Sequence, residues 1–225
     1  MSQGHPDSPV IAIDGPSASG KGTVAARVAA SLGYHYLDSG ALYRLVALVA
    51  LEGGIGLDDE ERLAQAASQM DVRFGEGGVW LAGRDVSMAL RGETVSVAAS
   101  RVAAHPAVRK ALLDRQRAFR RAPGLVADGR DMGSIVFPDA PLKVFLTADV
   151  ATRAERRHKQ LMEKGMYGKI DDVVEELRRR DERDSNRPVA PLKHYPDAIF
   201  LDTTRLGVDQ AVDRILGWWR EKSKQ

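Results

Sequence analysis

Short apolar runs alternate with longer amphipathic stretches along the chain, and this alternation predicts an α/β protein. The runs at residues 10–13, 34–37, 125–128, 143–146 and 198–201 each have the length and composition of a buried strand. Strands that alternate with helices imply right-handed crossovers and a parallel sheet. We therefore predict a three-layer α/β fold around a five-stranded parallel sheet.

Apolar residues at helical spacing predict the helices between these strands. After the second strand, for example, Leu42, Leu45 and Val49 fall on one face. A longer helical pattern contains Pro106, where it can break, because proline disfavours helix at the residue before it. Helices are expected at residues 24–32, 41–51, 58–70, 95–119 and 175–187.

The period changes from helical to extended between residues 71 and 88. Short extended runs at 71–74, 79–81 and 86–88 are separated by GEGG and AGRD, which are typical of hairpin turns. These runs predict a small antiparallel meander. We expect it to lie in a lobe, residues 66–115, inserted into a core formed by residues 10–65 and 120–225.

The composition is that of a globular protein with one core. The chain has 225 residues, of which 44% are hydrophobic and 28% are charged. It contains no cysteine, which excludes disulfides, thiolate zinc sites and cysteine nucleophiles. No apolar run approaches the length of a membrane span, and the first residues lack the basic-then-apolar layout of a signal peptide. We therefore expect a cytoplasmic protein with no membrane partner.

Arginines are concentrated at residues 115–121, 153–157 and 178–187, although the formal net charge is only +2. Nucleic-acid-binding surfaces also produce basic clusters, usually with exposed aromatic residues between them. Here acidic residues alternate with the arginines, as in RRRDERD. This alternation favours a small phosphorylated ligand over a nucleic acid.

The glycine-rich segment GPSASGKGT, Gly15–Thr23, lies between the first predicted strand and the first predicted helix. It fits the G-x-x-x-x-G-K pattern of a nucleoside-triphosphate phosphate loop, and this context disfavours the alternative of an ordinary tight turn. Loop amides and the helix N-terminus attract negative charge, and Lys21 can reach the terminal phosphates. Gly22 stands where Ser or Thr normally follows the lysine, and Thr23 comes one position later. Direct binding of Mg²⁺ by a hydroxyl is therefore left open.

Acidic residues follow two of the predicted strands, and ligands of parallel sheets bind beyond the carboxyl ends of the strands. Asp38 and Asp128 fall at this edge together with the phosphate loop. Asp128 has the position of an acid that orients Mg²⁺ or its water shell, and the alternative is a solvated turn aspartate. Arg130 and Asp131 follow directly and offer a phosphate-binding guanidinium and a hydrogen-bond acceptor.

The helix expected at residues 175–187 would place Arg180, Arg183 and Arg187 on one face. Charge runs are usually solvated helix faces, and composition alone does not decide against that. A phosphoryl-transfer site would use such a row, because arginines stabilise the charge that spreads over the transferring group.

Ser39, Tyr43 and Arg44 share one turn after the second predicted strand. A hydroxyl and a guanidinium at this position could hold a second substrate. For Tyr43, taken alone, core packing is the favoured alternative.

Together these segments resemble the bacterial cytidylate kinases, which are nucleoside monophosphate kinases of the phosphate-loop (P-loop) type. The resemblance covers nearly the whole chain, and the Lys-Gly-Thr ending of the loop is usual in nucleoside monophosphate kinases. The segments that carry it, in order, are GPSASGKGT, LDSGALYR, ASRVAAHPAVR, ADGRDMGSIVFPDAPLKVFL, RAERR and RRRDERDSNR.

The resemblance implies a P-loop kinase fold in which the meander belongs to an enlarged monophosphate-binding lobe and residues 153–168 form a mobile helical lid. It also implies that ATP binds to the glycine loop and that Arg153 and Arg157 of the lid approach ATP. The loop residues concerned are Gly15, Pro16, Ser17, Ala18, Ser19, Gly20, Lys21, Gly22 and Thr23.

The resemblance further implies how CMP is held. The residues that match those around the cytosine base are Ser39, Ser100, Arg109 and Asp131, and Tyr43 is expected beside the substrate. Those that match the monophosphate site are Arg44, Arg130 and Arg187, and those near the sugar are Arg180 and Asp184. We expect Lys21, Arg130, Arg180 and Arg187 to be catalytic and Asp128 to hold Mg²⁺ through a water.

The expected reaction is transfer of the γ-phosphoryl group of ATP, with Mg²⁺, to CMP or dCMP, which gives CDP or dCDP. Cytosine carries an N4 amino donor where uracil has a carbonyl, so Asp131 or Ser39 can accept from cytosine, and Arg109 can donate to its N3 and O2. Uracil would leave the Asp131 carboxylate unpaired. We expect small-molecule partners only, and a monomer.

Three alternatives remain. A GTP-dependent switch protein needs an Asn-Lys-x-Asp segment, whereas the only asparagine here is Asn186, which arginine follows. A kinase for another small acceptor, such as AMP, UMP or a metabolite alcohol, is a closer alternative. A P-loop binding protein without catalysis is the third, and the set of arginines argues against it.

Overall fold

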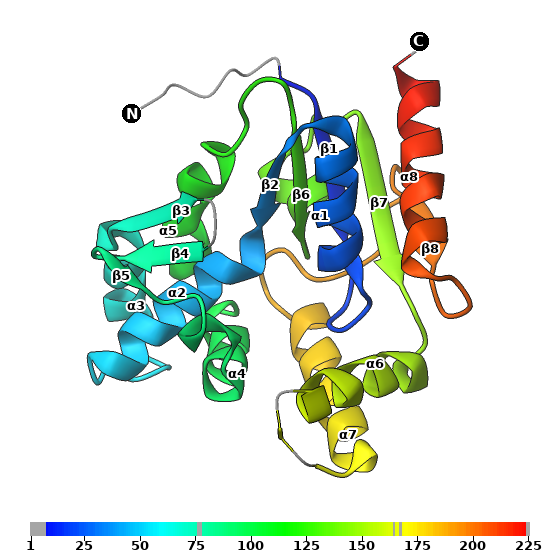
Figure 1. Cartoon of the computed structure of the whole chain (residues 1–225). Helices are drawn as coiled ribbons and strands as arrows, with labels where there is room; N and C mark the ends of the chain where they lie inside the picture. Colours follow the sequence, from blue (N-terminus) through cyan, green and yellow to red (C-terminus); the bar gives the residue numbers. More distant parts are fainter. Residues whose placement is uncertain (1–7, 76–77, 164, 167, 224–225) are drawn as a thin grey trace. The chain divides into compact units, whose positions relative to one another are not determined.

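The structure is a computed structural model that describes residues 8–75, 78–163, 165–166 and 168–223 (Figure 1). It divides into two compact units. The first unit consists of the described parts of Met1–Leu37 and Arg117–Gln225, and the second of the described parts of Asp38–Gln116.

A parallel sheet forms the centre of the first unit. Within the described residues it has five strands, as the apolar runs predicted. Residues Val10 to Ile13 of the central strand are fully buried, which is the reason that its sequence is a continuous apolar run. In spatial order the strands are β2 (His35–Asp38), β6 (Leu125–Gly129), β1 (Val10–Asp14), β7 (Leu142–Thr147) and β8 (Ile199–Asp202).

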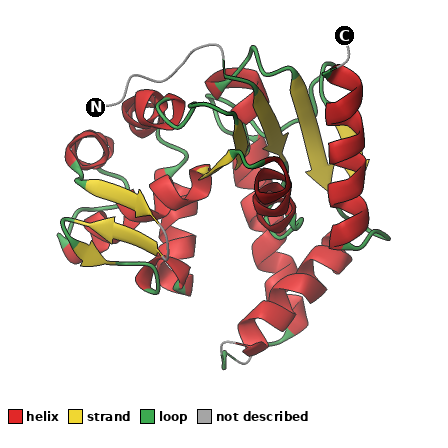
Figure 2. Cartoon of the chain, turned by 45° about the horizontal axis from the view of Figure 1, so that its top comes forward, coloured by secondary structure: helices red, strands yellow, loops and turns green. Residues whose placement is uncertain are grey.

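Two helices, α1 (Lys21–Leu32) and α8 (Val208–Lys222), pack against each other and against this sheet (Figures 1 and 2). Val28 of α1 and Ile215 of α8 are fully buried in one apolar core with residues of β1 and β7. None of the helices in the described part of the chain is long and apolar enough to cross a membrane.

A second helix pair in the first unit, α6 (Val150–Glu163) and α7 (Ile170–Ser185), packs through a small cluster around Ala154 and Leu177. Residues 164 and 167 of the expected lid lie outside the described residues. Helix α7 ends at Ser185, and Asn186 is its C-cap. The expectation that Arg187 shares a helix face with Arg180 and Arg183 was therefore wrong, because Arg187 lies beyond the helix.

The second unit is mainly helical. Helix α2 packs against α3 and α4, so residues 38–65 join this unit and not the core to which we assigned them. The helical pattern of residues 95–119 is divided into two helices, and the second begins at Pro106, where a break was predicted. The elements are α2 (Ser39–Glu52), α3 (Glu60–Gln69), η1 (Ala89–Arg91), α4 (Glu93–Val102) and α5 (Pro106–Arg117).

The predicted meander is present in the second unit as β3 (Val72–Gly75), β4 (Gly78–Leu81) and β5 (Arg84–Asp85), which pair antiparallel. Its third strand was predicted at residues 86–88, which was wrong. Ala82 and Gly83 both have positive φ and form the turn, so pairing resumes directly at Arg84. Residues 76–77 of the first predicted turn lie outside the described residues.

Two glycines of the first unit give a matched test of this fold. A Cβ on Gly15 would lie 1.9 Å from the carbonyl oxygen of Leu146 in β7, whereas a Cβ on Gly217 in α8 would meet nothing within 4 Å. We expect Gly15→Ala to lower the free energy of unfolding by about 2 kcal/mol or more, because backbone must move. Gly217→Ala should raise it by about 0.5–1 kcal/mol, because alanine favours a helix interior. Urea unfolding followed by circular dichroism measures both, and a Gly15→Ala protein as stable as wild type would contradict this packing.

Candidate active site

The glycine loop connects β1 to α1 at the carboxyl edge of the parallel sheet. Ala18 and Gly20 have left-handed backbone conformations, with φ of 58° and 89°, and α1 begins directly afterwards at Lys21. The amides of a first helical turn have no acceptor within the helix, and they point out of its N-terminus. This loop therefore presents donors and a positive dipole end to an anion.

Lys21 and Ser19 are buried within this loop. The Lys21 ammonium donates a hydrogen bond to the carbonyl of Pro16 at 3.2 Å, which holds its charge at the loop. Ser19 is 1% exposed, and among the described residues its Oγ has no hydrogen-bond partner. A buried hydroxyl without a partner is costly, so Ser19 Oγ is a group that a bound ligand would satisfy.

Two arginines of α6 hold the loop through its carbonyl oxygens. Arg153 donates to Ser17 O at 3.1 Å and forms an ion pair with Asp181 at 2.6 Å. Arg156 donates to Ser19 O at 3.0 Å and to Thr203 O at 2.7 Å. These bonds fix the outward direction of the loop amides, because each amide shares a peptide plane with the preceding carbonyl.

Arg130, directly after β6, contacts the same loop. It donates to Ser17 Oγ at 2.7 Å and to the Asp184 carboxylate of α7 at 2.8 Å. Both partners of this ion pair are largely buried, since the side chains of Arg130 and Asp184 are 17% and 6% exposed. The pair therefore holds a guanidinium beside the phosphate loop.

Further arginines surround Asp184. Burial alone would raise the pKa of Asp184, but the charges of Arg130, Arg187 and Arg180 lower it below its usual range. Burial likewise opposes the charge of Arg130, but the carboxylates of Asp184, Asp128 and Asp181 together outweigh it and raise the pKa of Arg130. Arg187 is itself buried and donates to the Asp184 carbonyl at 3.1 Å. Both charges of the central pair are thus retained in the folded protein.

Asp128, at the end of β6, is 5% exposed and accepts a hydrogen bond from the phenol of Tyr36 at 2.5 Å. Tyr36 lies on the neighbouring strand β2. A Cβ on Gly22, in the first turn of α1, would lie 3.3 Å from Asp128 Oδ2. The carboxylate is therefore close to the N-terminus of α1, where the sequence predicted a metal-directed acid.

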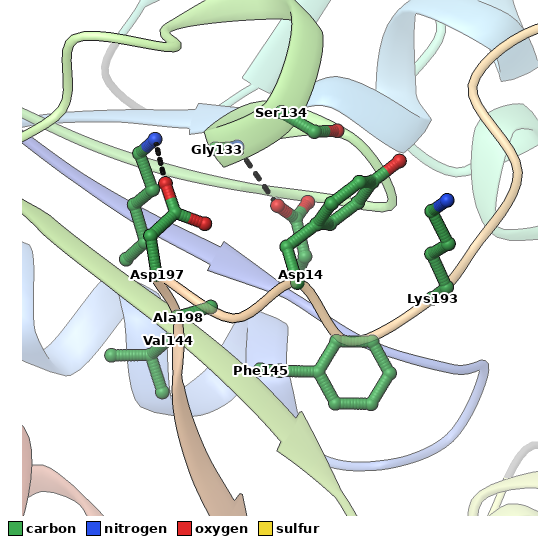
Figure 3. A pocket seen from close by; sticks show the side chains of 10 residues that line it. Asp14, Gly133, Ser134, Val144, Phe145, Lys193, Asp197 and Ala198 are labelled. Carbon is green, nitrogen blue, oxygen red and sulfur yellow. Dashed lines mark hydrogen bonds and ion pairs between the residues drawn. The ribbon is translucent and has the colours of Figure 1, made fainter.

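Asp14, the last residue of β1, accepts hydrogen bonds from the amides of Met132 and Gly133, each at 2.8 Å. These amides open the π-helical turn η2 (Met132–Val136), directly after the buried Asp131. Burial raises the pKa of Asp14 to about 7, and the Asp131 charge adds to this effect, while the two amides and Lys21 oppose it. Figure 3 shows Asp14 bound to Gly133 in a pocket that Ser134 and Lys193 also line. Asp14 thus fixes the segment that carries Asp131.

The second unit contains the remaining residues that the sequence predicts to bind the substrate. Asp38 caps α2 by accepting from the Ala41 amide at 3.1 Å, and its other oxygen pairs with Arg44. Arg109 of α5 lies over the Tyr43 ring, 5.5 Å from its centroid, and donates to the Ala103 carbonyl. Ser39, Tyr43, Ser100 and Arg109 are all buried in this unit.

The residues expected from the sequence thus form two sets, one in each unit. In the first unit the loop residues, Arg130, Arg180, Asp184 and Arg187 are gathered by direct contacts or electrostatic interactions. Arg157, expected near ATP, is partly buried on α6, and its neighbour Arg156 donates a hydrogen bond to the loop. The residues that sequence reasoning missed are Asp14, Tyr36, Arg156 and Thr203. For Asp14 a signal was available, since it is an acid at the end of an apolar run.

The carboxylates of the first unit suit a divalent ion that is bound mainly by a nucleotide. Within the described residues no group of three or more His, Cys, Asp or Glu side chains gathers as a metal cage. Mg²⁺ usually keeps several waters and is held by one or two carboxylates together with substrate phosphates. Asp128, buried beside the first turn of α1, can supply such a carboxylate.

Comparisons with known proteins identify similar chains and a similar fold. A family model described as cytidylate kinase matches residues 11–221. The cytidylate kinase of Chromobacterium violaceum is 60% identical over 214 residues, which cover 95% of this chain and 96% of the relative. That of Burkholderia ambifaria is 59% identical over 216 residues, which cover 96% and 94%. Among solved structures, a gluconokinase from Sinorhizobium meliloti has a TM-score of 0.50 at 15% identity, over 96% of this chain and 94% of that one, a likeness of fold alone.

The raised pKa of Asp14 predicts a pH dependence of stability. Between about pH 4 and pH 7 the folded chain keeps a proton on Asp14 that the unfolded chain has released, so its contribution to stability falls as the pH rises. Asp14→Asn removes the titration. We expect the unfolding free energy of wild type relative to the variant to fall by up to about 1.4 kcal/mol per pH unit in this window and to level off above it. Urea unfolding at about pH 5, 6, 7 and 8 tests this, and a difference that is constant with pH would contradict it.

Proposed function

The chain belongs to the cytidylate kinase family, and we propose that it transfers the γ-phosphoryl group of ATP to the phosphate of CMP and dCMP, which yields CDP and dCDP. One observation carries the proposal within the structure. Arg130 bonds to Ser17 of the phosphate loop at 2.7 Å while Asp184 holds it from α7. A guanidinium fixed at a nucleotide loop is suited to an acceptor that is itself a phosphate.

The chemistry follows from the charges that the chain supplies. A monophosphate oxygen is already an anion at neutral pH, so no side chain has to act as a general base. The reaction instead needs two polyanions to be brought together and the charge of the transferring group to be neutralised. We propose that Lys21 and the loop amides bind the ATP phosphates. Arg130, Arg180 and Arg187 would then neutralise the acceptor and the transferring group.

The magnesium ion is proposed to be bound mainly by the nucleotide phosphates, with Asp128 orienting one of its waters. A bound Mg²⁺ would supply charge neutralisation at the ATP phosphates. The chain's contribution is a fixed carboxylate, which Tyr36 contacts at 2.5 Å. This assignment rests on the position of Asp128 near the N-terminus of α1.

Cytosine recognition is assigned to Asp131. The residue is 4% exposed, and its backbone carbonyl accepts from the amides of Ile135 and Val136, which restrains the turn that carries it. A restrained carboxylate can accept a hydrogen bond from the N4 amino group of cytosine but not from the O4 carbonyl of uracil. The other expected roles stay predictions, as do the cytoplasmic location and the monomeric state. These are the roles of Asp184 toward the sugar, of Arg153 and Arg157 toward ATP, and toward CMP of Ser39, Tyr43, Arg44, Ser100 and Arg109.

Product analysis with ATP and a panel of nucleoside monophosphates tests the reaction. We expect CDP and dCDP from CMP and dCMP, and much less product from UMP or AMP. Lys21→Ala should lower turnover by about a hundredfold or more with the fold intact, because the charge beside the ATP phosphates is lost. Circular dichroism controls for folding. Near-normal turnover in that variant, or equal use of every monophosphate, would overturn the proposal.

Two variants of Asp131 test the specificity. Asp131→Ala should lower kcat/KM for CMP by about a hundredfold and leave that for UMP nearly unchanged, because only cytosine loses a hydrogen bond. Asp131→Asn can donate to the uracil carbonyl, so it should raise the UMP-to-CMP ratio further than alanine does. Steady-state kinetics with both nucleotides measure these ratios. Equal losses for CMP and UMP would reject the assignment.

A further inference from the structure

The pair formed by Tyr36 and Asp128 lies beside the first turn of α1. The phenol donates to Asp128 Oδ2 at 2.5 Å, which is in the range of strong hydrogen bonds between a hydroxyl and a carboxylate. The two residues lie on neighbouring strands of the sheet, β2 and β6, so the backbone on both sides is fixed. Asp128 is 5% exposed, and the bond is part-buried.

The glycine at position 22 lies against this pair. Gly22 is in helix α1 and does not have a positive φ, so its backbone conformation does not require glycine. The space beside it is tight: a Cβ would lie 3.3 Å from Asp128 Oδ2, and 3.5 Å from the Tyr36 hydroxyl, which is an ordinary contact distance. In the common phosphate loop, the residue after the lysine is Ser or Thr, and its hydroxyl binds Mg²⁺. Here the phenol and the carboxylate occupy the space into which that side chain would extend.

Thr23, one position later, does not replace that hydroxyl. Successive residues of a helix point about 100° apart, so Thr23 faces a different direction from position 22. Its side chain is exposed, whereas Asp128 is buried. The oxygen that faces position 22 in this structure is therefore that of the carboxylate, and the Thr23 hydroxyl points in another direction.

We infer that Tyr36 is a positioning residue for the magnesium site: its phenol fixes the Asp128 carboxylate in the orientation that binds the ion's water, in place of the hydroxyl of the common loop. This inference rests on the proposed binding of MgATP at the glycine loop. A hydrogen bond to Oδ2 sets the plane of the carboxylate and hence the direction of Oδ1. Partners of groups that ligate a metal directly typically change metal affinity by about 10–100-fold when removed, and a partner of a group that acts through a water is expected at the lower end.

The test is Tyr36→Phe, which keeps the ring that packs against the main core and removes only the hydroxyl. Isothermal titration calorimetry measures ATP affinity with Mg²⁺ and with EDTA, and the ratio of the two gives the contribution of the metal. We expect this ratio to fall about tenfold, while the affinity for metal-free ATP and the KM for CMP stay within about twofold. Tyr34→Phe is the matched control, because Tyr34 also packs on that core, against Trp219, and should leave the ratio unchanged.

Position 22 supplies a second, independent variant. Gly22→Ser should reduce the same ratio while Tyr36 is present, because its Cβ crowds Asp128 Oδ2. In the Tyr36→Phe background, the added serine hydroxyl can donate to the relaxed carboxylate, and the ratio should recover in part. If the effects of the two substitutions on this ratio are not additive, positions 22 and 36 act on the same carboxylate.

The outcomes separate the inference from the proposed function. Equal loss of affinity for ATP with and without Mg²⁺ in Tyr36→Phe, or no loss in either, overturns the inference. If Tyr36→Phe does not fold, Gly22→Ser alone decides, and an unchanged ratio overturns the inference as well. A third outcome is that Mg²⁺ strengthens ATP binding in the wild-type protein and not in Tyr36→Phe, while the wild-type protein does not phosphorylate CMP. This outcome supports the inference and refutes the proposed function.

Discussion

Negative charge buried at the carboxyl edge of the parallel sheet has to be neutralised, and the rest of the first unit is arranged around this requirement. An unpaired buried carboxylate costs several kcal/mol, and three of the carboxylates here are stabilised in different ways. Asp184 lies among arginines, Asp128 accepts from a phenol, and Asp14 accepts from two amides and has a raised pKa. Because Arg130 pairs with Asp184 and also contacts Ser17, the neutralisation of the acid positions a cation at the phosphate loop. This part of the proposed site is therefore already arranged in the protein without a ligand.

Much of this architecture could be predicted from the sequence, because it depends on local patterns. The apolar run before Gly15 gave a central strand, and the rule that ligands bind beyond strand ends grouped Asp128 with the loop. The break at Pro106 followed from proline stereochemistry alone. The positions of Lys21 and Arg130 beside the loop followed from the same logic, since glycine loops and guanidinium groups suit phosphate, whereas their roles toward the nucleotides stay predictions.

The features that were missed depend on contacts between distant segments. Arg156 and Arg157 lie three and four residues after Arg153, and both spacings lie on one helix face, so no pattern could tell which one reaches the loop. Tyr36 differs from an ordinary apolar strand residue only in its hydroxyl, and the partner of that hydroxyl is 92 positions away. The error in placing Arg187 on a helix has another cause. Helix α7 ends at Ser185, although the pattern of charged residues continues past it.

The bonds from α6 to the loop carbonyls have a mechanical consequence. Arg153 and Arg156 tie the first half of this helix to Ser17 and Ser19, and Arg153 also ties it to Asp181 in α7. A hinge within this half of α6 would rotate the peptide groups that set the direction of the loop amides. Any motion of α6 that preserves these two contacts with the glycine loop must therefore pivot on the C-terminal side of Arg156, while the preceding two turns keep their place against the loop.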